Sequence, residues 1–121
     1  VAARLSNATS VAPALAAAAA EGAERIADVP VYFSDPIVRR AQSLQKSADA
    51  RPPRASANAR TLAAFGLKPG DKARVRQGEA GALLECALDE RLPDGVVRLP
   101  AAHASTSTLG PMFGPLTMEP A

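Results

Sequence analysis

The clearest alternation of apolar and polar residues lies at residues 72–77, which read KARVRQ. Ala73 and Val75 fall on one side of this pattern and the charged residues fall on the other, as in a half-buried β-strand. Of five further candidate segments, residues 31–33 and 96–99 consist mainly of β-forming residues, and the others follow loop or turn signals. The sequence therefore predicts six short strands, at residues 31–33, 54–57, 72–77, 83–89, 96–99 and 116–119.

A helix and a tight turn precede the clearest strand. Asn58 is a good N-cap, residues 59–65 are mostly helix formers, and Gly66 stands where a helix places its C′ glycine. Pro69 and Gly70 then suit the two central positions of a type II turn, in which Gly70 takes a positive φ. Residues 37–45 form either one helical turn or an irregular crossing segment, so we expect one or two short helices in all.

The first part of the chain carries little structural information. Residues 11–20 are apolar but mostly alanine, and they are too few to span a bilayer. We expect residues 1–23 to be a linker or a frayed helix, and residues 24–121 to form one domain. Because the chain starts with Val1 rather than methionine, it is expected to be a processed or excised piece.

The predicted strands also specify a core. The side chains expected to face inward are Val75, Leu84, Cys86, Leu88, Val97 and Leu99. Cys86 is the single cysteine, so the chain has no internal disulfide and suits a reducing, cytosolic compartment. We expect a small buried thiol at this position rather than a reactive one.

Positive charge is concentrated in residues 37–60, where six basic residues accompany one acid, Asp49. Such a segment can contact nucleic acid or another anionic surface. It contains no aromatic residue that could stack on a base, so we expect a solvated or protein-contacting surface and no nucleic acid.

Candidate catalytic chemistry is sparse. His103 and Cys86 are the only residues of their types, and together they make no recognisable metal site. The glycines fit no phosphate-binding motif, and Ser105 beside His103 is weak evidence for a nucleophile. We therefore predict no catalytic, metal or cofactor-binding residue. In the alternative interpretation, Arg39, Arg40 and His103 hold a cofactor's pyrophosphate.

Two segments resemble the molybdopterin-dinucleotide-binding domain. Residues 58–75 read NARTLAAFGLKPGDKARV and residues 92–100 read LPDGVVRLP, similar to two characteristic runs of that family. The domain is the C-terminal double-psi β-barrel of molybdenum oxidoreductases such as formate dehydrogenase and DMSO reductase. The resemblance implies a mainly β fold, a small double-psi β-barrel.

A further resemblance covers most of the chain. Residues 24–45 and 100–114 are similar to the C-terminal region of the large iron–sulfur subunit of bacterial NADH-quinone oxidoreductase (complex I). That subunit transfers electrons from NADH towards quinone through clusters held by cysteines in its N-terminal region. The resemblance implies a C-terminal fragment ending near the natural terminus, without metal, cluster or cofactor of its own. It also implies a location on the cytoplasmic side of the inner membrane, without membrane insertion.

Three functions follow from these observations. The first is a non-catalytic structural domain that contacts the remainder of the large iron–sulfur subunit and neighbouring peripheral-arm subunits. The second is a pterin-dinucleotide-binding domain of a molybdenum oxidoreductase, and the third is a free-standing barrel that binds nucleic acid or protein. Cysteine clusters encoded upstream would favour the first, and a molybdenum ligand encoded upstream would favour the second.

Overall fold

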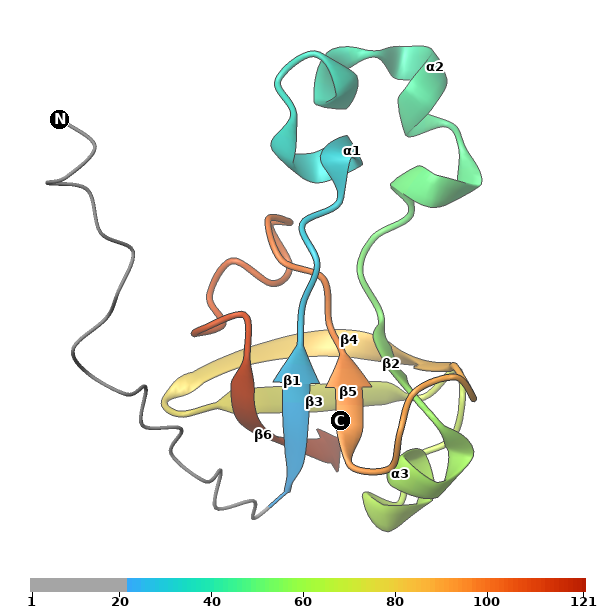
Figure 1. The fold of residues 1–121 in the computed structure, drawn as a ribbon, viewed down its shortest axis with the longest axis vertical. Coiled ribbons are helices and arrows are strands. Elements are labelled where there is room, and N and C mark those ends of the chain that lie inside the picture. The colour runs from blue at the N-terminus through green and yellow to red at the C-terminus, as the bar shows by residue number, and fades with distance from the viewer. Residues whose placement is uncertain (1–21) are drawn as a thin grey trace, which may run out of the picture.

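The structure, a computed structural model, describes residues 22–121, so the linker predicted at residues 1–23 lies almost wholly outside the described residues. Six strands close into a barrel in the order β1-β5-β2-β4-β3-β6 (Figure 1). Their bounds are β1 (Ala23–Ile26), β2 (Ala55–Ala57), β3 (Lys72–Gln77), β4 (Ala80–Leu88), β5 (Val96–Arg98) and β6 (Gly114–Pro120). The predicted mainly β fold is confirmed.

Pairing around the barrel is mixed. Strand β1 runs parallel to β5, and β2 runs parallel to β4, whereas the other four pairings are antiparallel. Both parallel pairs join strands that are not consecutive in the chain. Closure leaves no open strand edge, and the strand number and mixed pairing agree with the predicted small double-psi barrel.

The predicted first strand is wrong. Residues 31–33 lie in a helical turn, α1 (Val31–Ser34), and the first strand is instead β1. The N–H groups of Ser34 and Asp35 donate to the carbonyls of Pro30 and Val31, which closes the turn. The β-forming side chains here have no strand to pair with, because the barrel is already closed by β1.

The chain between β1 and β2 forms a helical arm, residues 27–54, that projects from one end of the barrel (Figure 1). After α1 it contains the 3₁₀ helix η2 (Val38–Arg40), α2 (Gln42–Gln45) and the 3₁₀ helix η3 (Ala48–Ala50). Of the two alternatives for residues 37–45, the structure has the helical one, and the arm holds more short helices than expected. Local hydrogen bonds hold it together, including two from Gln45 Nε2 to the carbonyls of Tyr32 and Val38.

The predicted helix, turn and strand unit is confirmed. Asn58 Oδ1 accepts a 2.8 Å hydrogen bond from Thr61 N–H at the start of α3 (Ala59–Ala64). At its end, Leu67 N–H donates to the Leu62 carbonyl, as in a Schellman motif. Gly70 has a φ of +93° within the turn that precedes β3, which is the positive value that the sequence predicts.

Alternation along β3, β4 and β5 builds the core. Five of the six predicted inward side chains are buried: Val75, Leu84, Cys86, Val97 and Leu99. The prediction for Leu88 is wrong, because this side chain is 49% exposed. Leu88 is the last residue of β4 and pairs with Ala57, the last residue of β2, so it stands at the rim of the barrel.

The burial of Cys86 makes its thiol unreactive. It is 1% exposed in the core, and burial, together with the charges of Asp71 and Glu85, raises its pKa above the usual value. We expect the native chain to react with a thiol reagent orders of magnitude more slowly than the same chain in denaturant. Colour development with Ellman's reagent measures this, and comparable rates in the two states would contradict the buried position.

Within residues 22–121, no helix has the length and apolar character needed to cross a membrane.

Candidate functional site

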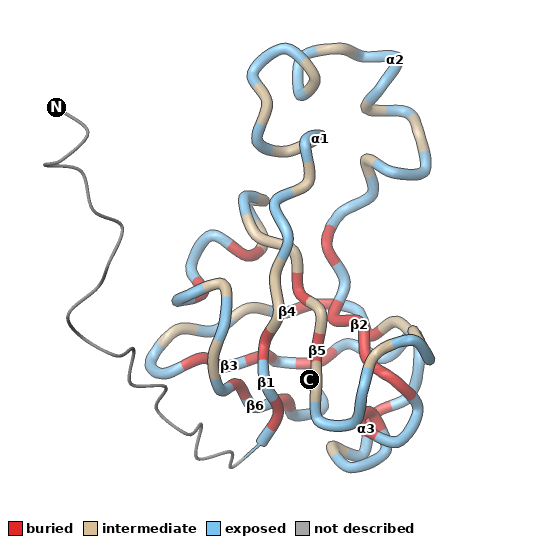
Figure 2. The backbone as a smooth tube through the Cα atoms, viewed as in Figure 1, coloured by how far each residue is buried: buried red, intermediate tan, exposed pale blue. Residues whose placement is uncertain are grey.

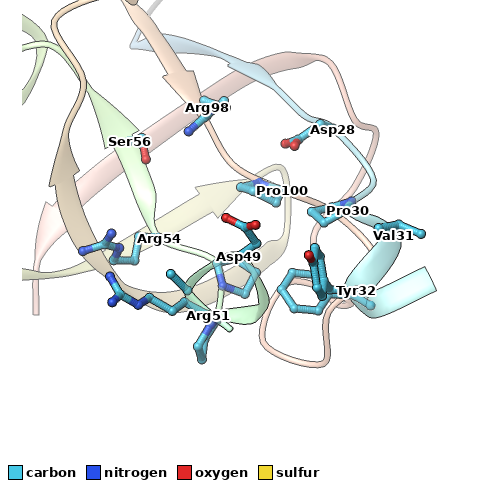
Figure 3. Close-up of a pocket in the computed structure, with 14 residues that line it drawn as sticks. Asp28, Pro30, Val31, Tyr32, Asp49, Arg51, Arg54, Ser56, Arg98 and Pro100 are labelled. Atoms are coloured by element: carbon cyan, nitrogen blue, oxygen red, sulfur yellow. The ribbon is translucent and has the colours of Figure 1, made fainter. Parts of the chain in front are cut away.

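A cleft of about 490 Å³ lies between the helical arm and the end of the barrel (Figure 3). Val31 and Tyr32 of α1 line one side, and Arg51 and Arg54 of the segment that returns to β2 line the other. Strand β5 and the residues that follow it supply the floor. The cleft thus exists because the arm leaves β1 and returns to β2 at the same end of the barrel.

Charges of both signs line this cleft. Three arginines and two aspartates face it, with the Ser56 hydroxyl beside them: Arg51, Arg54, Arg98, Asp28 and Asp49. In Figure 3 the carboxylate of Asp49 lies in the middle of the cleft, and the guanidinium ends of Arg51 and Arg54 are directed away from it. A carboxylate at the centre repels an entering anion, so the arginines do not form an uninterrupted anion site.

Nearby acids already engage two of these arginines. Arg54 Nη1 lies 3.5 Å from Glu85 Oε1, and Arg98 Nη2 lies 3.8 Å from Asp89 Oδ2. The Nε atom of Arg98 is buried and has no hydrogen-bond partner among the described residues. Of the described residues that line the cleft, none is a histidine or a cysteine. The cleft can therefore form ion pairs and hydrogen bonds, but it offers no nucleophile of the His or Cys type.

Asp89 lies near Arg98 of the cleft and also binds Arg91 in the turn after β4. Its carboxylate accepts hydrogen bonds from the Arg91 side chain, at 2.9 Å to Nε, and from the Arg91 backbone N–H. These bonds, aided by the charges of Arg91 and Arg98, lower the pKa of Asp89. Because the folded pKa lies below the unfolded one, Asp89 stabilises the fold above its unfolded pKa. That contribution is lost as the pH falls through the folded value.

We expect Asp89→Asn to remove this part of the pH dependence. The variant should be less stable than wild type at about pH 7, and the difference should shrink towards about pH 2.5. Urea unfolding at the two pH values measures it. Glu79→Gln, an exposed change in the hairpin after β3, is the control that should show no such trend. A constant difference at both pH values would contradict the role of Asp89.

The residues of the alternative cofactor interpretation do not line this cleft. Arg39 and Arg40 lie exposed on η2. His103 lies in the loop after β5, where its ring packs edge-on against Phe33 with the ring centroids 4.8 Å apart. Its Nδ1 accepts a hydrogen bond from Ser105 N–H and lies 2.8 Å from Ser105 Oγ. The imidazole thus takes part in the packing of its own loop against the arm.

A buried arginine is the polar feature that sequence reasoning missed. Arg25 of β1 is 1% exposed, and within the described residues no carboxylate forms an ion pair with it. Its guanidinium donates instead to Gln77 Oε1 at 3.0 Å and to the carbonyls of Leu99, Gly110 and Pro111. Burial lowers the pKa of Arg25, but an arginine stays charged at physiological pH. This side chain fastens the long loop after β5 to the barrel.

Metal-binding groups do not gather in the part of the chain that the structure describes. There, no three side chains of the His, Cys, Asp or Glu types lie close enough together to hold a metal ion.

The helical arm presents an unusual surface. None of the residues in α1, η2, α2 or η3 is buried. Figure 2 shows the same contrast, with buried positions in the barrel and exposed or intermediate positions along the short helices. Among residues 22–121, seven large apolar side chains are exposed, and four of them belong to the arm: Val29, Val31, Ile37 and Leu44. The arm thus concentrates exposed apolar side chains in a segment of 28 residues, 27–54, that contributes no buried residue from its helices.

No protein-family model matches the chain, and no curated protein matches it either. Among solved structures, acetylene hydratase from Pelobacter acetylenicus is similar to it, with a TM-score of 0.48 and 22% sequence identity. The match covers 73% of this chain and 12% of that enzyme's chain, so the chain corresponds to a small part of the length of that protein.

Proposed function

We propose that this chain is a non-catalytic structural domain of the large iron–sulfur subunit of bacterial NADH-quinone oxidoreductase. In this proposal the domain lies in the peripheral arm on the cytoplasmic side of the inner membrane. It packs on the remainder of its own subunit and on neighbouring subunits. Electrons pass from NADH to quinone through clusters outside this chain, and the domain itself binds no metal, cluster or pterin. The resemblance of residues 24–45 and 100–114 to that subunit supports this assignment.

The single observation that carries the structural role is the exposed helical arm. Its helices have no buried residue, and Ile37 is 80% exposed. Burying a Val, Leu or Ile side chain stabilises a protein by about 1.5–3 kcal/mol relative to leaving it exposed. A free arm forgoes that stabilisation at each of its large apolar residues, whereas an arm packed against a partner gains it. Docking against a partner therefore explains why the arm carries large apolar side chains that the chain itself does not bury.

A pterin-dinucleotide-binding domain of a molybdenum oxidoreductase is the second candidate. The observation that favours it is the set of arginines in the cleft, because a guanidinium group binds a pyrophosphate with two parallel hydrogen bonds. The central carboxylate of Asp49 disfavours it, as does the position of Arg39, Arg40 and His103 outside the cleft. The residues present therefore fit the cofactor poorly, and we derive no chemistry from it.

Elemental and pterin analysis of the full-length parent protein separates the two candidates. We expect iron and acid-labile sulfide, with no molybdenum or tungsten and no fluorescent pterin after oxidative extraction. Stoichiometric molybdenum together with a pterin nucleotide would overturn the structural proposal in favour of the second candidate. The measurement needs no activity assay, so an enzyme that loses turnover during purification still gives an answer.

A further inference from the structure

The outer end of the helical arm carries uncompensated positive charge. Residues 37–46, which we call the arm tip, contain three cations and no acid: Arg39, Arg40 and Lys46. All three are exposed, and none forms an ion pair with any other residue that the structure describes. The tip includes η2 and α2, and α2 lies at the end of the arm farthest from the barrel (Figure 1).

The acids of the arm do not neutralise the positive charge of the tip. Asp28 and Asp49 line the cleft on the barrel side of the arm. Asp35 Oδ1 accepts two hydrogen bonds of 2.8 Å, from the backbone N–H groups of Ile37 and Val38, which fixes the turn that leads into η2. The acids of the arm are therefore turned towards the cleft, where Arg51 and Arg54 also lie, or engaged in a turn, and the three cations of the tip have no acid among residues 37–46.

Apolar side chains accompany these cations. Ile37 is 80% exposed at the start of the tip, and Leu44 of α2 is 41% exposed. The same ten residues therefore present exposed apolar side chains together with guanidinium and ammonium groups. Charged groups at the rim of an interface set its specificity and register, while the apolar centre supplies most of the affinity.

We infer that the arm tip docks into an apolar recess bordered by aspartate and glutamate side chains on the parent protein. This inference rests on the proposed function and adds the chemistry of the partner surface. The carboxylates pair with Arg39, Arg40 and Lys46, and the recess receives Ile37 and Leu44. A bidentate pair between a guanidinium and a carboxylate gives such a contact a fixed orientation.

The tip suits a protein surface better than a membrane or a nucleic acid. Its helices are only three and four residues long, whereas a membrane-surface segment is a longer amphipathic helix. Residues 37–46 contain no aromatic side chain that could stack on a base. Anionic lipid vesicles and RNA are nevertheless included as probes in the test.

Two readouts on the full-length parent test the inference. Trypsin cleaves after Arg39, Arg40 and Lys46, so slow cleavage there reports that the tip is covered. A carbodiimide activates a carboxylate, and the Lys46 amine then displaces the activating group to form an amide, so mass spectrometry identifies carboxylates in direct contact. The variant Arg39→Lys/Arg40→Lys keeps the charge and adds two amines. Arg76→Lys, on the exposed face of β3, is the matched control.

We expect trypsin to cleave the tip at least about tenfold more slowly in the parent than in the 121-residue chain alone. We also expect amide links from residues 39, 40 and 46 to carboxylates of the parent outside residues 22–121, and none from residue 76. Slow cleavage without such links would overturn the acidic recess but leave the docking role. Cleavage as fast as in the free chain would overturn the docking role itself. Protection that appears only after anionic vesicles or RNA are added would overturn the inference.

Discussion

Arg25→Met should destabilise the barrel by about 3 kcal/mol or more, because it removes the buried guanidinium that donates to three carbonyls at the start and end of the loop after β5. The carbonyls of Leu99, Gly110 and Pro111 and the Oε1 atom of Gln77 would all lose their bond to the guanidinium. Methionine fills a similar volume without hydrogen bonds, so the effect would not come from a cavity alone. Thermal and urea unfolding of the variant and wild type measure it.

Arg76→Met is the matched control for this substitution. Arg76 is an exposed residue of β3 whose guanidinium forms no ion pair with any residue of the described chain. Its replacement should change stability by less than about 0.5 kcal/mol. Equal, small effects at the two positions would contradict the role of Arg25. Arg25→Lys should recover little, since one ammonium cannot reach the acceptors on both sides of the site.

Gly22→Ala should have the second largest effect, because two costs combine at this residue. Gly22 has a φ of +102°, and a Cβ there would lie 2.5 Å from the carbonyl oxygen of Leu116 in β6. A backbone atom cannot swing aside, so β1 and β6 would have to shift. We expect a loss of about 2–4 kcal/mol, from the strained φ together with the overpacking.

Gly70→Ala isolates the conformational cost. Gly70 has a similar φ of +93°, but a Cβ there would meet no atom within 4 Å. Its replacement should therefore cost only about 1 kcal/mol. Comparison of the two urea midpoints gives the contribution of the contact with Leu116. If both variants lost the same stability, the close approach of β6 to Gly22 would be wrong.

The parts of the fold that the sequence predicts correctly are those set by neighbouring residues. Asn58 caps the helix that follows it and Gly70 turns the chain, each through residues within a few positions, and the alternation that places Val75 in the core is contained in residues 72–77. The misplaced first strand has the opposite origin. Residues 31–33 have high β propensity, but the closed barrel pairs Ala23–Ile26 with β5 and β6 instead.

The pattern of apolar and polar residues does not predict β1, because a buried arginine occupies one of its inward positions. In β1 the alternation places Arg25, a charged residue, among the inward positions. A pattern of apolar and polar residues therefore predicts no half-buried strand there. Its acceptors lie on β3 and on the loop after β5, at least 52 positions away, and only the folded chain brings them together.

The sequence predicts the candidate site less well than the fold. The sequence shows that residues 37–60 are basic, but it does not show that their arginines lie at two separate places. Arg51 and Arg54 line the cleft, whereas Arg39 and Arg40 lie on the arm tip. That division depends on where the arm leaves and rejoins the barrel. His103 offered a candidate ligand by residue type alone, and in the folded chain it bonds with Ser105 in its own loop.

The docking of the helical arm on its parent protein is the central claim, and amide hydrogen exchange tests it most directly. Exchange is compared for residues 27–54 in the 121-residue chain alone and in the full-length parent, with the amides of β3 and β4 as the internal reference. We expect the amides of the arm to exchange rapidly in the chain alone and to become strongly protected in the parent, while β3 and β4 are protected in both. Rapid exchange of the arm in both proteins would contradict the claim.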